Sequence, residues 1–284
     1  MILRMLINEA GKRLGNAGIE DGRLEAELLM ALILNISRLD ILINSEMEIS
    51  DKEEEKFYEL VARRLNREPI AYISGHREFM GLDFKVKHGI LIPRPDTEIL
   101  VETVIEAAKN DKMKTSAEIG IGSGCISVSL AKYTDLMCYG TDMSIEAVKT
   151  ACENAVMNDV EDKTFFCEGD IFKGLPERKF DIVVSNPPYI KRKDMENLMP
   201  DVRDYEPYTA LCGGDDGLDF YRVITSDAAN RLNRGGYIFY EIGHDEAEDV
   251  SHILRQSGFT NIKVVKDLSG LDRVVSARKE DSDV

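Results

Sequence analysis

The sequence predicts an α/β protein in which helices cover both faces of a mostly parallel sheet, preceded by a small all-α domain. Three observations support this prediction. Apolar residues recur at helical spacing through about the first 75 residues. Farther along the chain, short apolar strands alternate with helical segments, which is typical of a parallel sheet. Near the end, the segments 261–267 and 272–278 follow each other like an antiparallel strand pair that closes the sheet.

The composition is that of a chain with a sizeable core and without an extended nucleic-acid surface. Of the 284 residues, 43% are hydrophobic and 31% are charged, and this length suggests about two domains. The 36 basic and 52 acidic residues give a net charge of −16, whereas a duplex-binding surface needs clustered lysines and arginines. We therefore expect no direct nucleic-acid binding, while a basic protein partner is compatible with this charge.

Apolar runs, cysteines and histidines together indicate a cytoplasmic protein. The longest apolar run, 28–34, is far shorter than the roughly 20 residues that span a bilayer. No basic region precedes a long apolar stretch at the N-terminus, so we expect neither a signal peptide nor a membrane segment. The five cysteines form no Cys-x-x-Cys pair and the four histidines are scattered, which predicts reduced thiols and no metal site. We expect a monomer.

The helical N-terminal domain is expected to span residues 1–75. Gly15 and Gly18 interrupt the first helical pattern. Ser50 and Glu53 have the spacing of a capping box at the start of a later helix, and Pro69 ends that helix. The domain contains no glycine-rich loop and no paired catalytic groups, so it is interpreted as a small helical bundle.

A β-hairpin linker is expected over residues 76–93, because two short apolar runs between Phe79 and Ile92 are separated by glycine turns. Pro93-Arg94-Pro95 then stiffens the chain, since each proline fixes its own φ and restricts the residue before it. The second domain is expected to span residues 94–284. Its strands are predicted over 117–121, 137–141, 164–168, 180–185 and 236–242, and its helices over 126–132 and 144–157.

The first chemical motif is a glycine-rich loop between a predicted strand and a predicted helix. It reads Glu-Ile-Gly-Ile-Gly-Ser-Gly-Cys over 118–125. Glycines let the backbone turn tightly and approach a ligand, and the free N–H groups of the following helix attract an anionic group. The dinucleotide fingerprint requires a third Gly or Ala at the position that Cys125 occupies here. A plain strand–helix turn is the alternative interpretation.

Acidic residues after successive strands favour a nucleoside site. Glu118, just before the loop, disfavours a pyrophosphate but suits a ligand with an amino group. Asp142 is placed to accept hydrogen bonds from both ribose hydroxyls, and Asp170 from an adenine amine, although each alone also fits a loop cap. S-adenosylmethionine therefore fits better than NAD. The residues predicted from this pattern to bind the cofactor are Glu118, Gly120, Gly122, Gly124, Asp142 and Asp170.

The second motif is Asn186-Pro187-Pro188-Tyr189, which directly follows the predicted strand 180–185. Methyl transfer to a planar NH2 group requires its delocalised lone pair to point at the methyl. The Asn186 side-chain oxygen and the Pro187 carbonyl can accept both N–H bonds, and neither proline adds a competing donor. Tyr189 is placed to pack on the flat group and exclude water. The catalytic gain comes from positioning and preorganised dipoles. A rigid loop that merely ends the strand is the alternative.

Further motifs extend over nearly the whole chain. They are Glu-Pro-Ile-Ala-Tyr-Ile (68–73), Gly-His-Arg-Glu-Phe (75–79), Ile-Pro-Arg-Pro-Asp-Thr-Glu (92–98), Glu-Pro (206–207), Gly-Gly-Asp-Asp-Gly-Leu (213–218), Glu-Ile-Gly (241–243) and Asp-Leu-Ser-Gly-Leu-Asp-Arg (267–273). With them the chain resembles the HemK-type glutamine methyltransferases that modify peptide chain release factors. The Asn-Pro-Pro-Tyr motif is shared with methylases of adenine and guanine amino groups, whereas the 92–98 run is narrower.

The resemblance implies a class I S-adenosylmethionine-dependent methyltransferase fold, which is Rossmann-like. It implies S-adenosyl-L-methionine as cofactor and methyl transfer to the side-chain amide nitrogen of the glutamine in the Gly-Gly-Gln motif of release factors. It further implies that the N-terminal domain helps to hold this protein substrate. By carry-over, the cofactor is lined by Gly120, Ile121, Gly122, Ser123, Gly124, Asp142 and Asn186. The resemblance further implies that Ile171 flanks the adenine and that residues 186–189 grip the glutamine.

The chain departs from the family pattern at two positions. Glu118 stands where Asp is usual, and Glu246 stands near a position where many members have Gln, which we interpret as a surface difference. Arg94 and Glu98 either shape the site or fix the turn between the domains. Two other functions stay open: methylation of an exocyclic amino group on a nucleic-acid base, and a non-enzymatic docking module, which the intact loop and the intact run 186–189 disfavour.

Overall fold

The computed structural model describes residues 1–280, and their contacts form two compact units. The first unit contains residues 1–75 together with 199–205, and the second contains 76–198 and the described residues from 206 onward. The first boundary between the units falls after Gly75. The hairpin after this boundary belongs to the second unit, whereas a short stretch from far along the chain belongs to the first.

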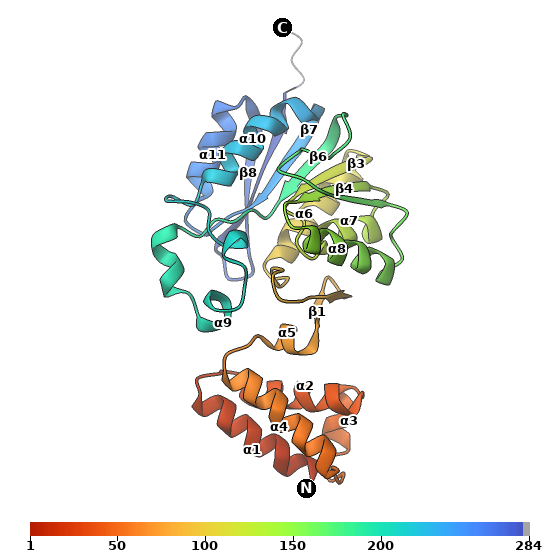
Figure 1. The fold of residues 1–284 in the computed structure, drawn as a ribbon. Coiled ribbons are helices and arrows are strands. Elements are labelled where there is room, and N and C mark those ends of the chain that lie inside the picture. Colours follow the sequence, from red (N-terminus) through yellow and green to blue (C-terminus); the bar gives the residue numbers. More distant parts are fainter. Residues whose placement is uncertain (281–284) are drawn as a thin grey trace. The chain divides into compact units, whose positions relative to one another are not determined.

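The first unit is built from helices (Figure 1). The predicted capping box is present, because the Ser50 side chain accepts a hydrogen bond from the Glu53 N–H and the Glu53 carboxylate accepts one from the Ser50 N–H at 2.9 Å. Side chains such as Leu6, Leu29 and Phe57 are fully buried between the helices. The helices are α1 (Leu3–Asn16), α2 (Gly22–Leu34), α3 (Arg38–Ile43), α4 (Asp51–Leu65), α5 (Ile70–Ser74) and α9 (Pro200–Arg203).

Helix α1 continues through Gly15 but ends at Asn16, before Gly18, whereas the sequence predicts that both glycines interrupt it. The close packing of α2 explains the difference. A Cβ atom on Gly22, the first residue of α2, would lie 2.8 Å from the Gly11 carbonyl oxygen and 2.8 Å from the Gly15 nitrogen. Glycine at position 22 therefore lets the two helices approach closely, and this packing outweighs the low helix propensity of Gly15.

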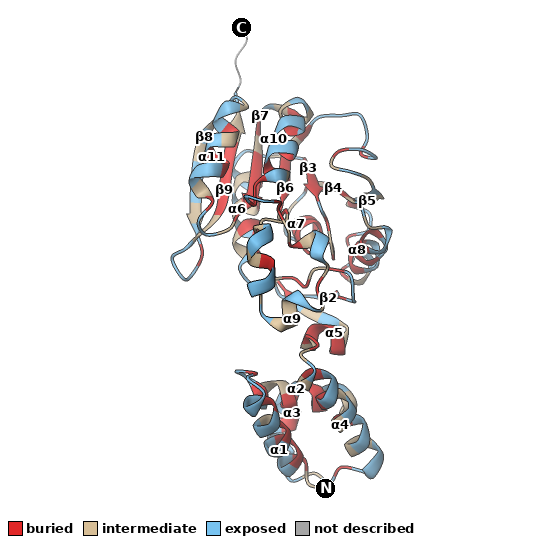
Figure 2. Ribbon diagram, turned by 60° about the vertical axis from the view of Figure 1, so that its left-hand side comes forward, coloured by how far each residue is buried: buried red, intermediate tan, exposed pale blue. Residues whose placement is uncertain are grey.

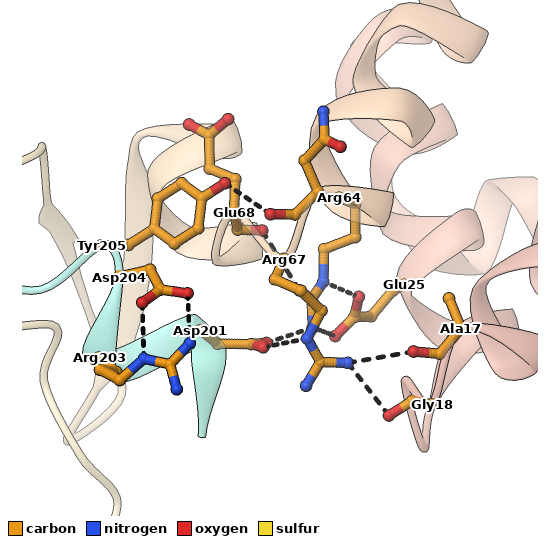
Figure 3. A network of polar contacts seen from close by, with 11 residues as sticks. Ala17, Gly18, Glu25, Arg64, Arg67, Glu68, Asp201, Arg203, Asp204 and Tyr205 are labelled. Atoms are coloured by element: carbon orange, nitrogen blue, oxygen red, sulfur yellow. Dashed lines mark hydrogen bonds and ion pairs between the residues drawn. The ribbon is translucent and has the colours of Figure 1, made fainter. Parts of the chain in front are cut away.

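A charge network fixes the stretch 199–205 to the helical part of the first unit (Figure 3). The Arg64 side chain is only 6% exposed, and its guanidinium lies 2.8 Å from the Asp201 carboxylate and 2.5 Å from that of Glu25. Arg67 lies 2.6 Å from the same aspartate. The Tyr205 hydroxyl donates to a backbone carbonyl at the end of α4 at 2.6 Å. A buried guanidinium needs opposite charges around it, so Asp201 completes the surroundings of Arg64.

The second unit is built on a seven-stranded sheet in the order β5-β4-β3-β6-β7-β9-β8 (Figure 1). Strands β3 to β7 pair in parallel, whereas β9 pairs antiparallel with both β7 and β8. The predicted mostly parallel sheet with an antiparallel closing pair is therefore confirmed. The strands are β3 (Thr115–Ile119), β4 (Met137–Asp142), β5 (Thr164–Glu168), β6 (Phe180–Ser185), β7 (Leu232–Glu241), β8 (Phe259–Lys266) and β9 (Asp272–Lys279).

Helices cover both faces of this sheet, and the strands between them are buried (Figure 2). Ile182 and Val184 of β6 belong to the same hydrophobic cluster as residues of α6, α7 and α8, whereas Val183 belongs to the cluster that contains α10 and α11. This alternation is the period of two expected of a strand buried on both sides. The helices are α6 (Thr97–Asn110), α7 (Cys125–Tyr133), α8 (Ile145–Met157), α10 (Asp219–Arg231) and α11 (Ala247–Gln256), with short 3₁₀ turns η1 (Arg192–Asn197) and η2 (Tyr208–Ala210).

The hairpin at the start of the second unit is shorter than predicted. Strands β1 (His76–Phe79) and β2 (Leu82–Lys85) pair antiparallel around Met80 and Gly81, both with positive φ, as a tight hairpin turn requires. The prediction extended the second strand to Ile92, but residues beyond β2 form an irregular loop that buries its apolar side chains without strand pairing.

No helix among residues 1–280 is long and apolar enough to cross a bilayer. All five cysteines are free thiols. The end of the predicted frayed tail, 281–284, lies outside the described residues.

Candidate functional site

A cavity of about 690 Å³ opens at the carboxyl ends of the central strands of the second unit. The chain runs from β3 outward to β4 and β5, and then returns to place β6 on the other side of β3. Ligands of open α/β sheets bind beside such a reversal, outside the carboxyl ends of the strands. Residues that follow β3, β4, β5 and β6 all line the cavity, and all lining residues belong to the second unit.

The glycine loop forms one wall of this cavity. Gly120, Gly122 and Gly124 all have positive φ, at 77°, 53° and 79°. A Cβ on Gly124 would lie 2.8 Å from the Ala151 Cβ, so this glycine permits helix α7 to pack closely on α8. A Cβ on Gly120 or Gly122 would meet no protein atom within 4 Å. The space beside those two glycines is therefore open to a ligand.

Asp142, the last residue of β4, braces the glycine loop. Its carboxylate accepts a hydrogen bond from the Gly122 N–H at 2.9 Å with one oxygen and from the Ser144 N–H at 2.9 Å with the other. Asp142 also lines the cavity. Because each carboxylate oxygen can accept more than one hydrogen bond, Asp142 keeps acceptor capacity for a ligand.

Glu118, the second-last residue of β3, is 1% exposed and lines the same cavity. Its carboxyl accepts a hydrogen bond from the Ser127 N–H at 2.9 Å. Burial raises the pKa of the Glu118 carboxyl to about 8, against the lowering effect of the Ser127 hydrogen bond. A cationic group brought beside it would favour the ionised carboxylate.

Asp170 and Ile171 follow β5 and line the far end of the cavity. The Asp170 side chain is 51% exposed and pairs with Lys173 at 2.8 Å. Ile171 has a positive φ of 57°, and its carbonyl accepts a hydrogen bond from the Thr141 hydroxyl at 2.5 Å. This bond holds the backbone of the loop against the end of β4.

Asn186 stands directly after β6, where the sequence places it, and lines the cavity with Pro187 and Pro188. Its side-chain Nδ2 donates to the Thr97 hydroxyl oxygen at 3.3 Å. Tyr189 is not among the lining residues, because its ring packs against the hydrophobic cluster between the sheet and α10. Burial raises the pKa of the Tyr189 hydroxyl above its ordinary value.

Of the predicted site residues, the structure brings all but Gly124 and Tyr189 to the wall of one cavity. Two residues to which the sequence pattern assigned no role lie beside Asn186, and one of them, Thr97, also lines the cavity. Thr97, the first residue of α6, is 2% exposed, and Glu241, the last residue of β7, is 1% exposed. Both lie within runs that carry the family resemblance, which was the only signal for them.

The carboxyl group of Glu241 is buried, which is unusual for an ionisable group. Burial raises the pKa of the Glu241 carboxyl to about 7, while the polar side chains of Thr97 and Asn186 nearby and the charge of Arg273 oppose that shift. Ser185 pairs with Tyr240 in the sheet, so Glu241 lies beside the residue that follows β6.

Two other acidic residues hold loops near the start of α6 in place. Glu206 is buried, pairs with Arg94 and accepts a hydrogen bond from the Ile92 N–H at 3.3 Å; Arg94 lines the cavity. Glu98 instead accepts a hydrogen bond from the Met80 N–H at 2.7 Å and holds the hairpin turn.

The interpretation of Glu246 as a surface difference is wrong, because this residue is 2% exposed. Its carboxyl accepts hydrogen bonds from the Gly243 N–H at 3.0 Å and from the Tyr221 hydroxyl at 3.4 Å. Burial raises the pKa of the Glu246 carboxyl to about 7. The sequence could not show the burial of Glu246, because this residue lies in a polar stretch of the chain and is covered by Tyr221 on α10.

Two family models match the chain. The PrmC N-terminal domain matches residues 5–75, and the methyltransferase small domain matches residues 95–201. The chain is 44% identical over 284 residues to the release factor glutamine methyltransferase of Clostridium botulinum, covering 98% of this chain and 100% of that protein. It is 40% identical over 277 residues to that of Geobacter sulfurreducens, covering 97% and 96%.

Among solved structures, a methyltransferase from Pyrococcus furiosus superposes with a TM-score of 0.54 at 21% identity, covering 77% of this chain and 97% of that chain. The ribosomal protein L11 methylase of Lactobacillus delbrueckii subsp. bulgaricus superposes with a TM-score of 0.51 at 18% identity, covering 69% and 84%. At these identities the likeness concerns the fold, and it confirms the class I methyltransferase fold predicted from the sequence.

Proposed function

The chain belongs to the release factor glutamine methyltransferase family, and we propose that it methylates the side-chain amide nitrogen of the glutamine in the Gly-Gly-Gln motif of peptide chain release factors. Family membership favours this amide over the amino group of a nucleic-acid base, which the sequence motifs alone left open. The observation that carries the proposal is that the glycine loop and Asn186 share one cavity.

The residues of this cavity fit S-adenosylmethionine, on which this family depends. A volume of about 690 Å³ is within the range of small-molecule sites, roughly 300–1,000 Å³. We propose that Glu118 faces the amino group of the cofactor, Asp142 accepts the ribose hydroxyls, and Asp170 and Ile171 flank the adenine. The glycine loop from Gly120 to Ser123 forms the adjoining wall. When bound, this cofactor supplies an electrophilic methyl group on a sulfonium sulfur.

The chain's own contribution at the reacting atom is to hold an amide nitrogen. We propose that the Asn186 Oδ1 and the Pro187 carbonyl accept the two N–H bonds of the glutamine side chain, which points the nitrogen lone pair toward the methyl group. Pro188 stiffens this loop, and the packed ring of Tyr189 anchors its end to the core. No strong base is needed before transfer, because the nitrogen becomes acidic only once it has gained the methyl group.

A methyl-transfer assay with labelled S-adenosylmethionine tests the proposal. Purified release factor should acquire label, and the same factor with its Gly-Gly-Gln glutamine replaced should not. Label on RNA or on another protein, with none on the release factor, would keep the cofactor and overturn the substrate.

We further propose that the enzyme acts in the cytoplasm as a monomer. The free thiols support the compartment. Sedimentation at micromolar concentration would show a mass of about twice 31.9 kDa if the monomer is wrong.

A further inference from the structure

The side-chain amide of Asn186 has two chemically opposite ends. Its oxygen accepts hydrogen bonds and its NH2 group only donates them. The glutamine amide of the substrate also presents an NH2 group, so only the oxygen of Asn186 can grip it. The protein must therefore select one of two amide orientations that have almost the same shape.

The groups around Asn186, all within the second unit, distinguish the two orientations of its amide. Asn186 Nδ2 lies 3.3 Å from the hydroxyl oxygen of Thr97, at the start of α6. The carboxyl of Glu241, at the end of β7, lies close enough to the side chains of Thr97 and Asn186 for them to lower its pKa, and its Oε2 is buried without a hydrogen-bond partner among the described residues. Strand β7 is the neighbour of β6 in the sheet, so the three residues meet at the carboxyl ends of these two strands.

We propose that Thr97 and Glu241 are positioning residues that hold the Asn186 amide with its oxygen toward the glutamine. This inference rests on the proposed role of Asn186 as an acceptor. An ionised Glu241 offers only acceptors, so the Thr97 hydroxyl donates to it and turns its own lone pairs toward Asn186. The NH2 group of Asn186 satisfies those acceptors. The reversed amide would place its oxygen against the Thr97 oxygen and the carboxylate.

The charges around Glu241 oppose one another. Burial and the charge of Asp96 raise the pKa of the Glu241 carboxyl to about 7, while the guanidinium of Arg273, which lies 3.0 Å from Asp267 and 3.4 Å from Asp96, lowers it, so the ionised form predominates above neutral pH. Thr97 and Glu241 are both at most 2% exposed, so water does not compete for these hydrogen bonds.

The pair Thr97→Val and Thr97→Ser separates the hydroxyl from the shape of the side chain. Valine keeps the volume but removes the hydroxyl, whereas serine keeps the hydroxyl. We expect T97V to lower kcat roughly tenfold or more, while the dissociation constant for S-adenosylmethionine and the KM for release factor change less than about threefold. T97S should keep kcat within about threefold of the parent. Equal kcat in T97V and the parent would overturn the proposal.

Exchanging the amide of Asn186 and the carboxyl of Glu241 between the two positions gives a result that a loss of structure alone would not produce. Asn186→Asp presents oxygen on both sides and faces Glu241 with a like charge. Adding Glu241→Gln supplies an NH2 group, so the new aspartate can bond to Gln and still offer an oxygen to the substrate. We expect N186D/E241Q to exceed both single variants in kcat. A double variant no more active than N186D would contradict the proposal.

Failure of this inference is distinguishable from failure of the proposed function. If the parent enzyme labels the Gly-Gly-Gln glutamine but T97V retains full kcat, only the positioning role is wrong. If the parent does not label that glutamine at all, the proposed function is wrong. A parallel loss of cofactor affinity, melting temperature and kcat in T97V would assign Thr97 a purely structural role and overturn the inference.

Discussion

The carboxyl of Glu118 accepts a hydrogen bond from the backbone N–H of Ser127 at 2.9 Å, across the glycine loop that separates strand β3 from helix α7. This bond satisfies an N–H near the beginning of α7 that has no partner within the helix. It also fixes a buried carboxyl at the wall of the cavity. The same group thereby contributes to local structure and, in the proposed site, to cofactor recognition.

The first prediction concerns the cost of keeping this carboxyl buried. Its pKa is about 8 in the folded protein and 4.5 for an exposed glutamate. Between these values the unfolded chain ionises Glu118 and the folded chain does not, so stability falls as pH rises from 4.5 to 8. Glu118→Gln should therefore stabilise the protein by on the order of 2–4 kcal/mol at pH 8.5 and little at pH 4.

Urea unfolding at the two pH values measures this difference. Glu153→Gln provides the control, because the Glu153 side chain is 53% exposed and pairs only at the surface with Lys85. A Glu118→Gln variant whose stability gain is the same at pH 4 and pH 8.5 would show that the carboxyl is already ionised in the folded state.

The second prediction concerns Asp142. Asp142→Ala removes both the brace on the Gly122 N–H and the proposed acceptor for the ribose hydroxyls. We expect the dissociation constant for S-adenosylmethionine to rise roughly 10- to 100-fold, with little change in the KM for release factor. Asp170→Ala should have a smaller effect, since Asp170 is half-exposed and paired with Lys173. Titration calorimetry showing the reverse order would refute the assignment.

The third prediction concerns the substrate amide. Asn186→Ala should retain the fold and the affinity for S-adenosylmethionine within a few-fold, but lower kcat roughly 100-fold or more, because one of two amide acceptors is lost. Asn197→Ala, in the exposed part of η1, is the matched control and should leave kcat unchanged. Activity of Asn186→Ala within threefold of the parent would rule out the acceptor role.

The fourth prediction concerns the first unit. Asp201→Asn removes one of the charges around the buried Arg64 and should lower the free energy of unfolding by about 1–3 kcal/mol. Asp204→Asn is the matched control, because Asp204 and Arg203 are both more than 40% exposed and their pairing contributes about 0–1 kcal/mol at most. Indistinguishable unfolding curves for the two variants would show that Asp201 is dispensable.

Features encoded in local patterns could be predicted from the sequence. The capping box at Ser50, the order of strand and helix, and the loops after β3 and β6 depend on neighbouring residues, and the structure has them at the expected positions. Apolar residues that recur with a period of two or 3.6 indicate which face of a strand or helix meets the core, and for this reason the strands of the sheet could be predicted.

Features that depend on distant parts of the chain could not be predicted. Asn186 and Thr97 are hydrogen-bonded although 89 residues separate them, and nothing near either residue indicates the other. The burial of Glu246 comes from Tyr221 and its neighbours on α10. The prediction of strand structure up to Ile92 was wrong for a related reason. Apolar residues are buried equally well in an irregular loop when the surrounding core has space for them.

The ion pairs of Asp201 have a consequence for the modularity of this protein. Because 199–205 belongs to the helical unit, the chain passes from one unit to the other three times, and a single cleavage cannot separate two complete modules. A fragment beginning at His76 would carry Asp201 without Arg64, and a fragment ending at Gly75 would carry Arg64 without Asp201. Recombination that joins this helical unit to another catalytic domain must therefore transfer two pieces of coding sequence, and we expect the two parts to be inherited together.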